Sequence, residues 1–150
     1  MSARSTAVPL RPVPRRRPAP PAISLLQTAR HGLAEAAESA LPASRYVAAH
    51  LAALRAAAAV LAARGDPATT SRRGRPRSVW VLLPEVEPAL REWAAFFAAG
   101  AGKRAAAEAG LPRAVTTHEA NDLLHDAEVF VALVETTLGI DSQPMLPVAG

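Results

Sequence analysis

The helical fold of this chain is indicated most directly by residues 44–64, which read SRYVAAHLAALRAAAAVLAAR. Alanine has the highest intrinsic helix propensity, and the stretch contains neither glycine nor proline. The whole chain holds 36 alanines against eight glycines, and no Asn-Gly or Asp-Gly pair favours a β-hairpin. We therefore predict an all-α fold in which Ser44 is the N-cap of a helix over 44–64.

Helical spacing predicts the neighbouring elements outward from this stretch. A first helix covers 23–39, a turn at 79–83 leads into a helix that ends near residue 99, and a short helix spans 103–109. The last helix begins at a capping box, Thr116 to Glu119, and ends at Gly139. The chain is therefore expected to form a bundle of four to five helices. Pro84 is expected in the first turn of the helix that ends near residue 99, and Pro88 indicates a late start or a kink in that helix. In 44–64 the helical spacing predicts an apolar stripe that includes the histidine, formed by Val47, His50, Leu51, Leu54, Ala58 and Leu61. The predicted buried face of the helix to residue 99 includes Trp93 and Phe97.

Three segments fall outside this periodic pattern. Residues 1–22 contain six prolines and five arginines and are predicted to be a disordered basic tail. Residues 66–78 are predicted to be a basic flexible loop, and 141–150 an unstructured C-terminal tail. The single domain is therefore assigned to 23–140.

The formal net charge of +4 does not describe the predicted domain. Residues 1–22 carry five arginines and no acid, and residues 64–78 carry five arginines and one acid. Seven basic and twelve acidic residues remain for the rest of the chain. The predicted helical body is therefore acidic, and the basic charge belongs to one tail and one loop.

Composition also bounds the partners and the location. Six aromatic residues give the core few large side chains, so a second copy is expected to bury more apolar surface in a homodimer. The absence of cysteine excludes a disulfide framework and a thiolate zinc site. The longest uninterrupted apolar run, 56–63, is far shorter than the roughly 20 residues of a membrane span. No apolar stretch follows the charged N-terminus, so a cytoplasmic location without membrane contact is expected.

Arg45 and His50 form the leading candidate for chemistry. A guanidinium can hold a phosphate, and an imidazole can move a proton near neutral pH. Together they could cleave RNA without a metal, with His50 as general base on a ribose 2′-hydroxyl and Tyr46 as a supporting hydroxyl. The alternative is a partly buried histidine satisfied by a hydrogen bond, with Arg45 solvated near the start of the helix.

The chain resembles the HEPN superfamily of small helical RNases and nucleotide binders. Arg45 and His50 match its Arg-x4–6-His signature, and the segments 78–84, 92–100, 103–110 and 121–128 are similar to a small actinobacterial branch. The resemblance covers about 23–140 and implies a bundle of four or five helices that is often dimeric, with paired motifs facing each other. HEPN nucleases often have a polar residue where this chain has Tyr46, and their motif commonly lies later in the bundle. Many HEPN domains bind without cutting.

Two further clusters have weaker signals. His118, Asp122 and His125 share one helical stripe, which could ligate a divalent metal, but a solvated polar face is the more ordinary interpretation. We therefore expect no metal and no cofactor. A basic run contains Arg72, Arg73, Arg75 and Arg77 in the pattern Arg-Gly-Arg-Pro, which resembles an AT-hook that enters a narrow minor groove. Those four arginines are the candidate nucleic-acid-binding residues.

Three functions remain open at this point. The favoured one is a HEPN-type domain that binds RNA or a nucleotide, with Arg45 and His50 acting across a dimer as a metal-independent endoribonuclease. The second is a non-enzymatic dimeric helical adaptor that binds a protein partner. The third is a DNA-associated accessory protein that uses its basic loop.

Overall fold

The computed structural model describes residues 19–65 and 78–140, and within these ranges it contains helices and no β-strand. The elements are α1 (Pro20–Glu38), α2 (Pro42–Arg64), α4 (Val79–Val86), the 3₁₀ turn η3 (Pro88–Leu90), α5 (Arg91–Ala99), α6 (Ala101–Glu108) and α7 (Thr117–Leu138). The predicted all-α class is confirmed. Most of the predicted tails and loop, with Arg72, Arg73, Arg75 and Arg77, lies outside the described residues. The predicted boundary at residue 23 was wrong, because α1 already begins at Pro20, where proline suits a first helical turn.

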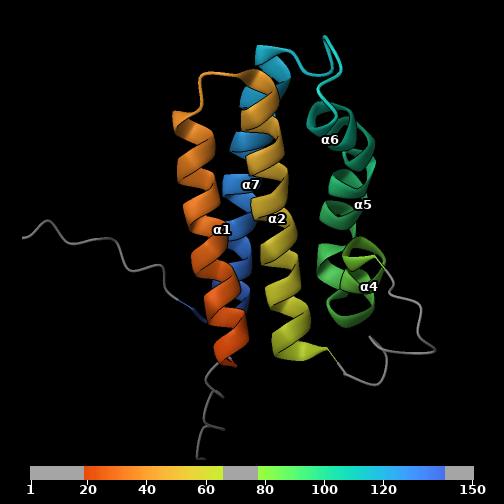
Figure 1. The fold of residues 1–150 in the computed structure, drawn as a ribbon. Helices are drawn as coiled ribbons and strands as arrows, with labels where there is room; N and C mark the ends of the chain where they lie inside the picture. The colour runs from red at the N-terminus through yellow and green to blue at the C-terminus, as the bar shows by residue number, and fades with distance from the viewer. Residues whose placement is uncertain (1–18, 66–77, 141–150) are drawn as a thin grey trace, which may run out of the picture.

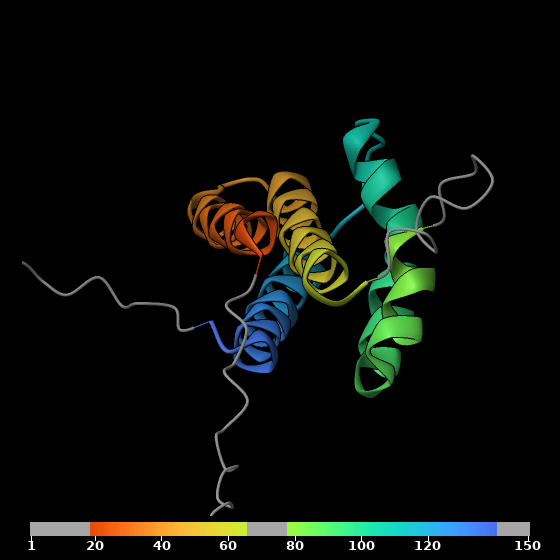
Figure 2. The ribbon, with the colours of Figure 1, turned by 90° about the horizontal axis from the view of Figure 1, so that it is seen from below.

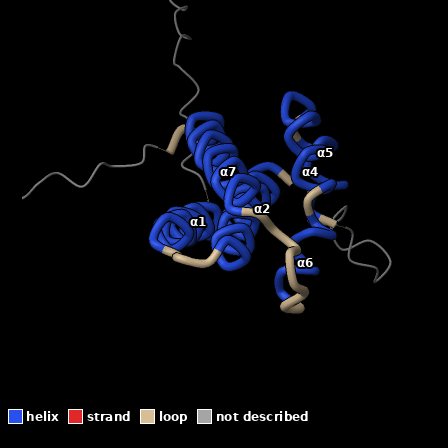
Figure 3. The backbone as a smooth tube through the Cα atoms, turned by 90° about the horizontal axis from the view of Figure 1, so that it is seen from above, coloured by secondary structure: helices blue, strands red, loops and turns tan. Residues whose placement is uncertain are grey.

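Helix α2 lies between two groups of helices (Figure 1). Helices α1 and α7 pack along it, and α4, α5 and α6 follow one another in a column on its other side. The view from below (Figure 2) places α2 and α7 between α1 and this column. The view from above (Figure 3) shows the same order. The alanine-rich helix that indicated the fold is therefore the helix that joins its two halves.

The buried face of α2 differs from the predicted apolar stripe. Val47, Leu51 and Leu54 are only partly buried, whereas His50 is fully buried. Most of the fully buried side chains are alanines: Ala49, Ala52, Ala53, Ala56, Ala57 and Ala59. The predicted stripe was wrong because α2 has neighbours on several sides, and the small side chains occupy its close contacts. At one of them, a Cβ added to Gly32 of α1 would lie 3.5 Å from the Cβ of Ala52.

An aromatic cluster fills the space between α7 and the column of short helices. Phe97 and Phe130 are both fully buried, and their ring centroids lie 5.1 Å apart. Trp80 of α4 stacks on Phe97 at 5.2 Å, and Trp93 of α5 lies 5.5 Å from Phe130. Aromatic side chains bury large apolar areas, so these four rings stabilise the packing of α4 and α5 against α7.

The helix ends match the sequence signals in part. The capping box of α7 is confirmed, since Glu119 N donates to Thr116 Oγ1 at 3.0 Å and Thr116 N donates to Glu119 Oε1 at 2.9 Å. Gly139 ends α7 in the left-handed region with φ 71°. The Ser44 cap was wrong, because α2 begins one turn earlier at Pro42, after Leu41. Proline is favourable at this first helical position, where its missing N–H has no partner to lose.

The boundary between α4 and α5 was also misplaced. Pro84 lies inside α4, and Pro88 opens the 3₁₀ turn that precedes α5. A proline interrupts the hydrogen bonds of a continuing helix, so α5 begins only after η3, which agrees with the late start predicted from Pro88.

Helix α2 has the length and the apolar composition of a membrane-spanning helix. A core helix of a soluble protein passes the same test, and half of the most apolar stretch of α2 is buried inside the bundle. Neither property decides the location of the chain.

Candidate functional site

Arg45 connects three helices near one end of the bundle. Its Nε donates to the carbonyl oxygen of Ala36 at 3.0 Å, and one terminal nitrogen donates to the carbonyl oxygen of Ser39. The other terminal nitrogen donates to Oδ1 of Asn121 on α7. The last carbonyls of a helix have no partner within the helix, and arginine is a common donor to them. Arg45 therefore closes the C-terminal end of α1 and ties it to α7.

His50 lies one and a half turns further along α2, and its side chain is 0% exposed. Its Nε2 is 2.8 Å from the carbonyl oxygen of Phe97, and its Nδ1 is 3.2 Å from Nη1 of Arg104. A guanidinium only donates, so Nδ1 accepts from Arg104 and the ring proton on Nε2 is donated to Phe97. Both nitrogens of a neutral imidazole are thus engaged.

Burial lowers the pKa of His50 below its ordinary value. The hydrogen bond with Phe97 acts in the opposite direction, and the positive charge of Arg104 lowers the pKa further. The balance favours the neutral ring, which is the form that the two hydrogen bonds require.

Gly100 allows the close approach of α2 to the junction of α5 and α6. A Cβ at this position would lie 2.8 Å from the hydroxyl oxygen of Tyr46 and 3.4 Å from Cδ2 of His50. Tyr46 is itself buried, and burial raises the pKa of its phenol. The tyrosine that was predicted to support catalysis is thus packed beside His50, with ring centroids 6.4 Å apart.

The basic residues of α6 are occupied by neighbouring groups. Lys103 pairs with Glu119 of α7 at 3.0 Å, and it also donates to the carbonyl oxygen of Ala114. Arg104 lies 3.6 Å from Glu108, measured from its Nε to the carboxylate, and this buried Nε has no hydrogen-bond partner. The cations near His50 therefore already have protein partners for much of their charge.

The structure does not bring Arg45 and His50 to a common site. None of the described hydrogen bonds joins them or gives them a shared partner, and each serves a different helix contact. Their catalytic role stays a prediction, as does the homodimer in which they would act. His118 and Asp122 lie 3.0 Å apart on the exposed side of α7, and no group of three His, Asp or Glu residues suited to a metal occurs in 19–65 and 78–140.

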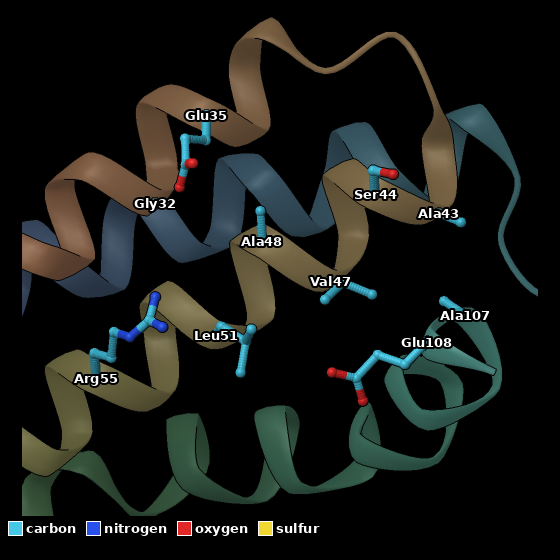
Figure 4. A pocket seen from close by; sticks show the side chains of 10 residues that line it. All are labelled: Gly32, Glu35, Ala43, Ser44, Val47, Ala48, Leu51, Arg55, Ala107 and Glu108. Carbon is cyan, nitrogen blue, oxygen red and sulfur yellow. The ribbon is translucent and has the colours of Figure 1, made fainter. Parts of the chain in front are cut away.

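A groove of about 470 Å³ runs along the outer side of α2, between α1 and α6. In Figure 4, the Arg55 side chain extends toward α1, and the carboxylate of Glu108 projects toward Val47 and Leu51. Glu35 borders the same groove, so two acids and one arginine line it. Val47 and Leu51 are partly exposed because they face this groove instead of the core.

A second, smaller groove of about 360 Å³ lies between α5 and α7 and is lined by Glu92, Trp93, Phe96 and Asp126. Phe96 is 45% exposed. Val129 and Leu133 are also exposed, and their spacing puts them on the same face of α7 as Asp126. We call this surface, Glu92, Trp93, Phe96, Asp126, Val129 and Leu133, the α5–α7 groove. Sequence reasoning missed it, although the spacing of Trp93 and Phe96 was a signal that both occupy one side of α5.

A family model described as SAV_6107-like HEPN matches residues 34–135 of the chain. The match covers more than half of the sequence and includes α2, the column of short helices and most of α7. Neither the curated proteins nor the solved structures contain a significant match.

Proposed function

Because the chain belongs to the SAV_6107-like HEPN family, we propose that it is a HEPN-type domain that binds a protein partner without cleaving RNA. The observation that carries this proposal is the state of His50, whose ring is fully buried with both nitrogens hydrogen-bonded. A general base needs a free lone pair within about 2.6–3.2 Å of the heavy atom that carries the proton it takes. The only lone pair on this ring accepts from Arg104.

Arg45 supports the same conclusion from the side of phosphate binding. Bidentate recognition of phosphate uses guanidinium N–H groups that face solvent. In this chain Nε and both terminal nitrogens of Arg45 donate to protein oxygens. Three of its five N–H groups are therefore already engaged in the contacts that join α1, α2 and α7.

The charge and polarity of the described surface favour a protein over a nucleic acid. Residues 19–65 and 78–140 hold eight basic and eleven acidic residues, so this part of the chain repels phosphate. The α5–α7 groove exposes apolar side chains, and exposed apolar patches with polar rims are typical of protein interaction sites. We therefore place the partner in this groove.

Purified full-length protein incubated with RNA in excess EDTA tests the catalytic part of this proposal. We expect no cleavage at any protein concentration. Cleavage that is lost in His50→Ala while the helical circular dichroism is retained would overturn the proposal. Products ending in a 2′,3′-cyclic phosphate would then identify the 2′-hydroxyl as nucleophile.

Binding of RNA through the arginine-rich segments is a second candidate, and the charge distribution favours it. Nine of the 17 basic residues fall in 1–18 and 66–77, where Asp66 is the only acid. If Arg72, Arg73, Arg75 and Arg77 each neutralise one phosphate of single-stranded RNA, the slope of log K against log salt should be about −3. Replacing all four by Gln should make the slope less steep by about 3, whereas the control Arg91→Gln, Arg113→Gln should leave it unchanged.

A further inference from the structure

The α5–α7 groove combines an aromatic floor with unpaired carboxylates. Trp93 and Phe96 lie edge to face with ring centroids 6.4 Å apart. Glu92 and Asp126 border these rings, and within 19–65 and 78–140 neither carboxylate has an ion-pair partner. The indole N–H of Trp93 also has no acceptor among the described residues. The groove thus offers flat apolar surface, one free donor and two negative charges.

Aromatic grooves of this kind bind proline-rich segments. A polyproline II segment has no internal hydrogen bonds, so its carbonyls accept from side chains such as an indole N–H, and its prolines stack on aromatic rings. Carboxylates at the rim pair with arginines beside the prolines. The ligand that fits is therefore a proline-rich segment that carries arginine and no acid.

This chain contains such a segment, residues 8–17, which read VPLRPVPRRR. Pro9 and Pro12 are three residues apart, which places them on one edge of a polyproline II helix with three residues per turn. Arg11 and the run 15–17 supply four positive charges and the segment has no acid. Its charge is opposite to that of the groove.

The segment also has sufficient reach. The first residue of α1 lies at the end of the bundle where α7 ends (Figure 1), and Leu133 is near that end of α7. Glu135 of α7 pairs with Arg30 of α1, and Asp126 lies about 180° from Glu135 around α7, so the chain must first pass around α7 to reach the groove. Residues 14–19 in an extended conformation span about 20 Å, which is enough for this path, so residues 8–13 can lie in the groove without a change in the helices.

We propose that the α5–α7 groove binds a proline-rich, arginine-bearing segment, and that residues 8–13 of the same chain occupy it. The inference rests on one part of the proposed function, namely that the partner binds in this groove. Its consequence is competition, because an external partner with the same chemistry must displace the chain's own segment.

A nitroxide label on the full-length chain tests this contact. The protein has no cysteine, so Val13→Cys provides a single labelling position. We expect the oxidised label to remove most of the intensity of the backbone amide signals of Trp93, Phe96 and Asp126, and of the Trp93 indole N–H signal, relative to the reduced label. Amides of the last two turns of α1, which are far from the label along the chain and in space, should keep their intensity.

The paired variant Glu92→Gln, Asp126→Asn should restore the intensities, because it removes both charges with little change in shape. The matched control Glu38→Gln alters an exposed carboxylate at the far end of α1 and should restore nothing. The inference would be overturned if the groove signals are not broadened, or if all signals of the protein are broadened equally. It would also be overturned if the broadening of the groove signals is the same in the paired variant. So would broadening that arises only when labelled molecules are mixed with isotope-enriched unlabelled ones, because the occupant would then be a second copy. None of these outcomes bears on RNA cleavage, so the proposed function fails or stands separately.

Discussion

Replacement of His50 by alanine removes a side chain that is completely buried and that satisfies two groups from other helices. The carbonyl oxygen of Phe97 would lose its donor, and an unsatisfied buried polar group costs about 1–3 kcal/mol. The cavity left by a ring of this size adds a comparable amount. Arg104 is partly exposed and can turn to water, so it contributes less. We expect His50→Ala to lower the free energy of unfolding by about 3–5 kcal/mol.

His50→Gln is the matched control for this change. The glutamine amide keeps an N–H that can donate to Phe97 and a carbonyl oxygen that can accept from Arg104. The free energy of unfolding of His50→Gln should be lower than that of the wild type by only about 1–2 kcal/mol, mainly because a non-planar side chain packs imperfectly in this position. Urea unfolding of the three proteins, followed by circular dichroism and tryptophan fluorescence, measures the differences.

The stability of the wild type should also depend on pH through this residue. The pKa of His50 is lower in the folded chain than its ordinary value, so the unfolded chain binds the proton more readily. The stabilisation is complete above about pH 6.5 and is lost as the pH falls from there toward the folded pKa. The slope cannot exceed about 1.4 kcal/mol per pH unit for one group, and His50→Gln should reduce it. A loss below 1 kcal/mol in His50→Ala, with an unchanged pH dependence, would refute the structural role of this histidine.

Three other substitutions test separate parts of the fold by the same unfolding assay. Arg45→Lys should lower the free energy of unfolding by about 1–3 kcal/mol, because an ammonium cannot reach the oxygens of Ala36, Ser39 and Asn121 together. An unchanged free energy of unfolding would contradict the contact of Arg45 with three helices. Phe130→Ala should cost about 3–5 kcal/mol, and the exposed Phe96→Ala less than about 1 kcal/mol, so equal losses would contradict the assigned burial. Thr116→Ala should cost about 1 kcal/mol by removing the cap of α7, and a stability equal to that of the wild type would mean that the cap is not formed.

The sequence was sufficient to predict α7 but not the packing of α2. In α7, polar and apolar residues alternate with helical period between a capping box and a terminal glycine, so the boundaries and the buried face follow from local chemistry. In α2 nearly every side chain is apolar, and periodicity cannot distinguish a buried alanine from a half-exposed leucine. Only the positions of the neighbouring helices decide which face is covered.

Prediction of the candidate site from the sequence had a similar limit. Spacing along α2 showed that Arg45 and His50 were near each other in the sequence, and the apolar position of His50 pointed to burial. It could not show that the partners of His50 come from Phe97 and Arg104, 47 and 54 residues away. The partner of Arg45 on α7, Asn121, is 76 residues away. Such contacts depend on the tertiary arrangement, and local pattern carries no signal for them.

The protonation state of His50 tests the central claim most directly, since the account requires a buried neutral ring with its proton on Nε2. Long-range proton–nitrogen correlation spectra of the full-length protein can report the shifts of both ring nitrogens from pH 8 to pH 5. We predict an unprotonated Nδ1, a protonated Nε2, and no titration of His50 near its ordinary pKa of about 6.5, with no change when RNA is added. A ring that titrates near that value, or that changes its tautomer with RNA, would contradict the structural assignment and restore His50 as a catalytic base.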